Sequence, residues 1–153
     1  MTSLRILCAA ALLACAAAHA ADNNGALAAW VGKYPSDTRD AKGGSLLQQP
    51  PLRTTLKAIL PRPEAALLGQ LDNESPVRQS GHYLIVDKCR PHDCPADAAM
   101  IVVDLESTKV WAAFFTRTPA SVSTRWYGNQ DDYNTLPDDI RAGFLKQHGS
   151  VVP

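Results

Sequence analysis

The sequence predicts an α+β domain: an antiparallel sheet of about five strands, with helices packed on one face and a disulfide-closed hairpin loop protruding. Three observations support this class. Leucines recur at helical spacing before residue 72, short β-type runs follow from Val77, and a helical pattern closes the chain. Helices followed by a block of strands are typical of α+β folds, and 153 residues with 46% hydrophobic content suit one globular core.

The first twenty residues, "MTSLRILCAAALLACAAAHA", predict an export signal cleaved after Ala20. Arg5 precedes an apolar run, which ends on small residues and is shorter than the about 20 apolar residues of a membrane span. The expected mature protein is therefore a single periplasmic domain over residues 21–153. "LLAC", ending at Cys15, is also similar to a lipoprotein cleavage box, so a membrane tether through a lipidated Cys15 is left open.

Removal of residues 1–20 takes away one base and leaves 14 bases against 15 acids. This near-neutral balance argues against a nucleic-acid partner, because phosphate binding needs an excess of Lys and Arg. The folded domain keeps only Cys89 and Cys94, and we expect them to form a disulfide in an oxidising compartment.

Four helices are predicted, three before the sheet and one after it. "LAAWVGKY", from Leu27, indicates a short N-terminal helix followed by a polar, Gly-rich connector. In the segment 51–71, "PLRTTLKAIL" and "PEAALLGQL" each carry a leucine stripe, and Pro61 and Pro63 between them predict two helices rather than one. "LPDDIRAGFLKQHG" has two acids in its first turn and predicts a closing helix.

Five extended runs predict the sheet: "VRQSG", "HYLIVDKC", "AMIVVDLE", "KVWAAFFTR" and "STRWYG". Their connections are too short for parallel crossovers, so neighbouring strands should be antiparallel and form a meander.

The stretch "DKCRPHDCP", residues 87–95, lies between two of these runs and should form a hairpin tip. A bond between Cys89 and Cys94 closes a six-residue ring, which is worth only about 2 kcal/mol of global stability. Its local effect is larger, because Pro91 and the ring leave His92 and Asp93 few conformations. A purely structural bridge that only tidies the hairpin remains an alternative.

A metal site or an enzyme is the rival interpretation of Cys89, His92 and Cys94. Structural zinc needs four ligands, typically from two separated pairs, and His82 is the one further candidate nearby. The sequence has no G-x-S-x-G, no H-E-x-x-H and no Gly-rich phosphate loop, and the cysteines could serve as nucleophiles only when reduced. The acids Asp131 and Asp132 are interpreted as a solvated loop.

"CRPHDC", between "YLIVDK" and "AMIVVDL", resembles the C-K-P-H-D-C loop of the periplasmic inhibitors of vertebrate lysozyme, the Ivy family. Five of the six loop residues agree, with Arg90 in place of lysine, and "KVWAAFF" is similar to the strand that follows. "AWV" at residues 29–31 is similar to a Trp-Val near the family's start. The two helices at 51–71 lengthen the distance to the loop, so we expect a divergent member.

The resemblance implies a protein inhibitor, not an enzyme, that needs no cofactor or metal and blocks the lysozyme active-site cleft. It implies that His92 contacts the catalytic acids, that Arg90 and Asp93 flank it, and that Pro91 and the disulfide Cys89–Cys94 keep the loop rigid. The expected partner is a lysozyme of undetermined class. The alternative is an immunity protein against another peptidoglycan hydrolase, and a homodimer is left open.

Overall fold

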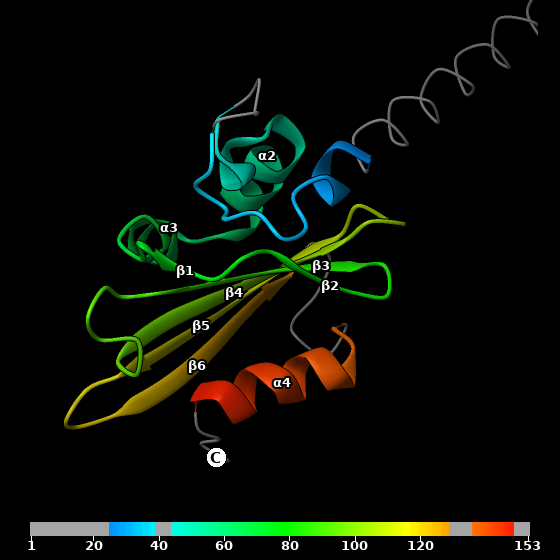
Figure 1. Ribbon diagram of the computed structural model, residues 1–153. Helices are drawn as coiled ribbons and strands as arrows, with labels where there is room; N and C mark the ends of the chain where they lie inside the picture. Colours follow the sequence, from blue (N-terminus) through cyan, green and yellow to red (C-terminus); the bar gives the residue numbers. More distant parts are fainter. Residues whose placement is uncertain (1–24, 39–43, 129–135, 149–153) are drawn as a thin grey trace, which may run out of the picture.

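The computed structural model describes residues 25–38, 44–128 and 136–148. The predicted signal peptide, Cys15 and the pair Asp131 and Asp132 lie outside the described residues, and no helix within those residues is long and apolar enough to span a membrane. After a helical turn at residues 25–28, the helices are η1 (Leu46–Gln48), α2 (Pro50–Ile59), α3 (Arg62–Leu68) and α4 (Asp138–His148). The strands are β1 (Asn73–Glu74), β2 (Arg78–Ser80), β3 (Tyr83–Cys89), β4 (Asp97–Asp104), β5 (Val110–Arg117) and β6 (Val122–Gly128) (Figure 1).

The strands form one antiparallel sheet in which β3, β4, β5 and β6 follow one another as a meander, as predicted. Two short strands share the outer edge of β3. Asn73 of β1 pairs with Cys89, and Gln79 of β2 pairs with Leu84. The sequence predicted β2 but missed β1, which lies beside the disulfide.

The predicted break between α2 and α3 is confirmed. Leu60 is extended, with φ −92° and ψ 126°, although its amide still donates to the Leu56 carbonyl, and Pro61 is extended before α3 begins at Arg62. A proline inside a helix removes a backbone donor and clashes with the preceding turn, so the chain leaves the helix here.

The prediction that helices pack on one face of the sheet is wrong, because α2 and α3 lie over one face and α4 lies over the other (Figure 1). The physical reason is that all eight residues of β4 are buried, so both faces need cover. The first face packs against α2 and α3 through Leu84, Ile101, Phe114, Leu52, Leu56 and Leu68. The second packs against α4 through Met100, Trp111, Phe115, Ile140 and Phe144.

Candidate functional site

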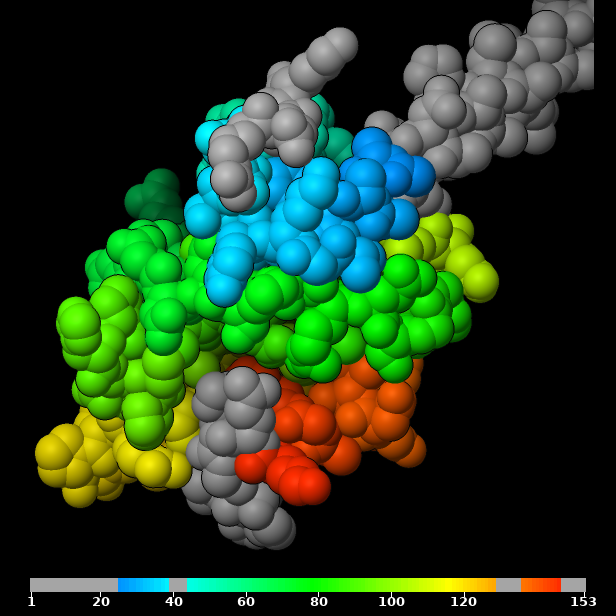
Figure 2. All heavy atoms as spheres, in the orientation of Figure 1, coloured from blue at the N-terminus to red at the C-terminus, as the bar shows by residue number. Residues whose placement is uncertain are grey.

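The predicted disulfide is present and joins Cys89 at the end of β3 to Cys94, with an S–S distance of 2.07 Å. We call residues 89–97, from Cys89 to the first residue of β4, the finger. Figure 1 places the finger at the same end of the sheet as the turn between β5 and β6. In Figure 2 the light-green finger and the yellow β5–β6 turn both form part of the outer surface. The hairpin tip predicted from the sequence is therefore confirmed.

Hydrogen bonds within the finger fold it into a tight turn. The Asp93 amide donates to the Arg90 carbonyl at 3.1 Å, and the Ala96 amide donates to the Asp93 carbonyl at 2.9 Å. His92 has φ 64°, in the left-handed region where histidine is one of the better tolerated residues. Pro91, His92 and Asp93 are exposed, so the tip presents one imidazole and one carboxylate to solvent.

The Arg90 side chain points back to the base of the finger and forms an ion pair with Asp97. Its Nη2 lies 2.6 Å from Oδ2 of Asp97, and its Nε donates to the same oxygen at 2.7 Å. The Asp97 side chain is only 11% exposed, whereas that of Arg90 is 41% exposed. Arg90 therefore braces the finger. A flanking contact between Arg90 and a target remains a prediction, and the exposed part of the side chain is available for it.

One residue of β1 contacts the finger and the next contacts the strand that leads into it, and sequence reasoning missed both. The side-chain amide of Asn73 donates to Cys94 Sγ at 3.0 Å and to Cys89 Sγ at 3.4 Å. The neighbouring Glu74 forms a 2.7 Å ion pair with Lys88 of β3. A two-residue polar strand has no periodicity, so the sequence offers no signal for it beyond the preceding leucine stripe.

A buried carboxylate holds α3 on the finger's end of the sheet. Oε1 of Glu64 accepts a hydrogen bond from the Tyr127 hydroxyl at 2.8 Å and from Nε of Arg125 at 3.1 Å. Burial alone would raise the pKa of Glu64, but these hydrogen bonds and the guanidinium charge outweigh it and lower the pKa. Arg125 also donates to Thr116, the residue that pairs with Asp97.

The structure bears directly on the rival metal or catalytic site. Both cysteines are consumed by the disulfide, so neither offers a thiolate as ligand or nucleophile. His82 lies near Asp104, with 3.9 Å between Nε2 and Oδ1, at the opposite end of β3 from the finger. Within the described ranges, no three His, Cys, Asp or Glu side chains gather as a metal site.

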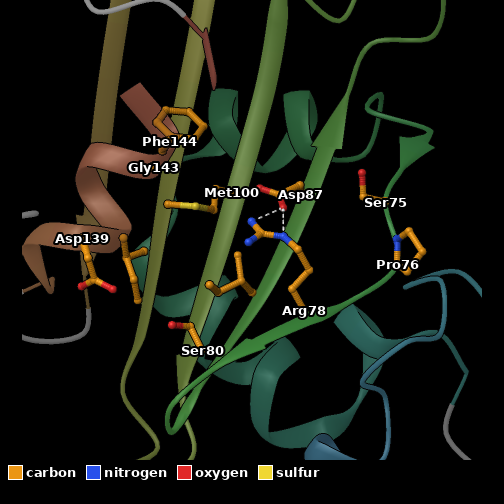
Figure 3. Close-up of a pocket in the computed structure, with 11 residues that line it drawn as sticks. Ser75, Pro76, Arg78, Ser80, Asp87, Met100, Asp139, Gly143 and Phe144 are labelled. Carbon is orange, nitrogen blue, oxygen red and sulfur yellow. Dashed lines mark hydrogen bonds and ion pairs between the residues drawn. The ribbon is translucent and has the colours of Figure 1, made fainter. Parts of the chain in front are cut away.

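A hollow of about 550 Å³ lies elsewhere, between the β2–β3 edge and α4 (Figure 3). Arg78 crosses its wall and donates to Oδ2 of Asp87 from Nη2 at 2.7 Å and from Nε at 3.1 Å. Apolar side chains from the sheet and α4 form much of the rest of the lining, and no His, Cys or Lys is found among its described lining residues. The polar lining residues beside Arg78 and Asp87 are Ser75, Ser80 and Asp139.

The described residues thus present a disulfide-closed, exposed loop on a well-packed α+β scaffold. The family model described as "Inhibitor of vertebrate lysozyme (Ivy)" matches residues 51–150, well over half of the chain. The chain therefore belongs to the Ivy family, as its loop predicted. A search of the curated proteins found no match. The matched range begins at the second residue of α2 and includes α3, the two helices expected to mark a divergent member, and it leaves out residues 29–31.

Proposed function

We propose that this protein is a periplasmic inhibitor of lysozyme that blocks the active-site cleft with the finger, and that His92 is its central contact. One observation carries the proposal: in a chain of the Ivy family, His92 is exposed at the tip of a disulfide-closed turn. Residues 1–20 supply the expected export signal, and a disulfide suits an oxidising compartment.

The chemistry of the tip matches the chemistry of a glycosidase cleft. Such enzymes hold two carboxyl groups on either side of the scissile bond. An imidazolium has two N–H donors, so one His92 side chain can serve both carboxyl groups at once. Asp93, exposed beside it, adds an acceptor for donors on the cleft wall.

Rigidity explains how so small a tip can bind well. Ordering a flexible loop on binding costs free energy that is subtracted from the affinity. The disulfide, Pro91 and the bonds of Arg90 to Asp97 order the finger before it meets its target. The binding energy of His92 is then retained rather than spent on ordering the loop.

The test is inhibition of a panel of hydrolases by residues 21–153 with the disulfide intact and after reduction, alkylation and removal of the reductant. The panel holds c-type, g-type and phage-type lysozymes together with peptidoglycan amidases. We expect inhibition of at least one lysozyme, and a large loss of it once the disulfide is opened. Inhibition of amidases alone would instead favour the immunity-protein alternative, and equal inhibition by the reduced chain would contradict the role of the rigid finger.

A further inference from the structure

Asn73 lies outside the finger, and its side chain contacts the disulfide. Its side-chain amide lies within hydrogen-bonding distance of both sulfurs, 3.0 Å from Cys94 Sγ and 3.4 Å from Cys89 Sγ. Its backbone pairs in register with Cys89, so strand pairing and the side chain act on the same bridge. Asn73 is 16 residues from Cys89 and 21 from Cys94 in the chain, so this is a tertiary contact.

The strand that carries Asn73 is itself fixed on both sides. Before it, Leu71 is fully buried against the leucines of α2 and α3. After it, Glu74 pairs with Lys88 at 2.7 Å and accepts the Ser36 amide at 3.0 Å, and its side chain is 7% exposed. β1 is therefore tied to the helical layer, to β3 and to the N-terminal segment at once.

We propose that Asn73 is a positioning residue, which acts through the Cys89–Cys94 bridge to fix the direction in which the finger presents His92. This inference rests on the proposed function. It also gives α2 and α3 a role in inhibition, because they deliver β1 to the base of the finger. The disulfide closes the ring, whereas Asn73 fixes the closed ring relative to the sheet.

Loss of the amide should act on the finger more than on the fold, because Asn73 is exposed and its two bonds end on the bridge. Without these bonds the finger has more conformational freedom, which it must lose when it binds. Ordering one or two side chains on binding weakens the affinity about three- to tenfold. The hydrogen bonds inside the finger should also open more often, since local openings depend on local contacts.

The variants are Asn73→Ala and Asn73→Asp, and the second keeps the shape of the side chain but replaces the N–H donor with an oxygen. The matched control is Gln79→Ala on β2, the other short strand on the same edge of β3, where an exposed amide donates to the Gly81 carbonyl at 2.9 Å. Three quantities are measured: the dissociation constant for an inhibited lysozyme, the Tm, and amide hydrogen exchange at Arg90 and Ala96.

We expect both Asn73 variants to bind about three- to tenfold more weakly. The finger amides should exchange faster, β4 core amides should exchange at the original rate, and the Tm should match that of Gln79→Ala. Affinity equal to wild type, or an equal loss in Gln79→Ala, overturns the proposal. An affinity loss accompanied by faster exchange throughout β4 assigns Asn73 a general structural role and overturns it too. Hydrogen exchange needs no target, so it tests whether Asn73 restrains the finger even if the chain inhibits no lysozyme.

Discussion

Arg90 and Asp97 form an ion pair across the base of the finger, with Nη2 and Nε of the guanidinium 2.6 Å and 2.7 Å from the same carboxylate oxygen. The Arg90 amide also donates to the Asp97 carbonyl at 2.9 Å, so backbone and side chain join the same two residues. We predict that Arg90→Ala lowers the free energy of unfolding by about 1–3 kcal/mol, because a largely buried carboxylate loses its charged donor. Urea unfolding followed by circular dichroism measures this change.

The control for this pair is a double-mutant cycle with Asp97→Asn, because neighbouring changes are not additive. With the carboxylate already neutralised, Arg90→Ala should cost clearly less than in the wild type. If the two changes are additive, the ion pair does not brace the finger. Arg90→Lys should recover only part of the stability, because one ammonium cannot reproduce the paired Nε and Nη2 bonds.

His92 at the exposed tip should dominate binding without supporting the fold. We predict that His92→Ala weakens inhibition by about 2–4 kcal/mol, or about 30- to 1000-fold, as expected of a central hot spot. His92→Asn is the sharper variant, because asparagine also tolerates the left-handed backbone at φ 64° but lacks the imidazole. Titration of both variants against an inhibited lysozyme, with Tm measured in parallel, separates binding from stability.

The assignment of His92 fails if His92→Asn inhibits within experimental error of the wild type. The matched control is Gln79→Ala, which removes an exposed amide from the edge of β3 and leaves the finger intact. It should change neither the inhibition constant nor the Tm appreciably, since surface substitutions of this kind usually change stability by less than about 0.5 kcal/mol.

The sequence was sufficient to predict what local patterns encode. β-branched runs marked β3, β4 and β5, prolines marked the break after Leu60, and the cysteines marked the hairpin tip between β3 and β4. The same runs also held an unused signal, because "AAMIVV" has no polar alternation and so indicates a strand covered on both faces. This absence of alternation predicts cover on both faces of the sheet, but it does not say which helix covers which face.

What the sequence could not show depends on tertiary register. Asn73 meets the disulfide only because two polar residues form a short edge strand after α3. The sequence predicted a target contact for Arg90 but not its second partner, because only the hairpin register brings Asp97 opposite the guanidinium. Glu64 reads as an ordinary helix acid, yet its partners Arg125 and Tyr127 lie more than sixty residues away along the chain. Such pairings have no local pattern that would reveal them.

Acid should destabilise the fold through Asp104, at the end of β4. Burial alone would raise the pKa of this carboxyl, but the Ser107 hydroxyl, the amides of Glu106 and Ser107 and the nearby His82 together lower the pKa below its ordinary value of 3.8. A lowered pKa means that the charged form stabilises the fold. This contribution is complete above the ordinary pKa and is lost as the pH falls through the folded pKa.

We therefore predict that Asp104→Asn is less stable than the wild type at pH 7, by about 1–3 kcal/mol, and that the difference shrinks on acidification below its ordinary pKa of 3.8. Thermal unfolding from neutral pH down to about pH 2.5 follows this change. Ser107→Ala removes one of the donors and should show a smaller loss in the same direction. A stability difference that stays constant across this range would contradict the role of the charge.

Inhibition itself should depend on pH through His92. Two carboxyl groups of a cleft favour a charged imidazole between them. Affinity should then fall as the pH rises, because a neutral imidazole is attracted less strongly by two carboxylates than an imidazolium is. The target's own acids also titrate, so the useful quantity is the ratio of the inhibition constants of His92→Gln and the wild type at each pH. We expect this ratio to be largest at low pH and to decline toward one as the pH rises, because glutamine keeps polar contacts but carries no charge. A ratio that stays the same from about pH 5 to 9 would mean that His92 binds as a neutral hydrogen-bonding group.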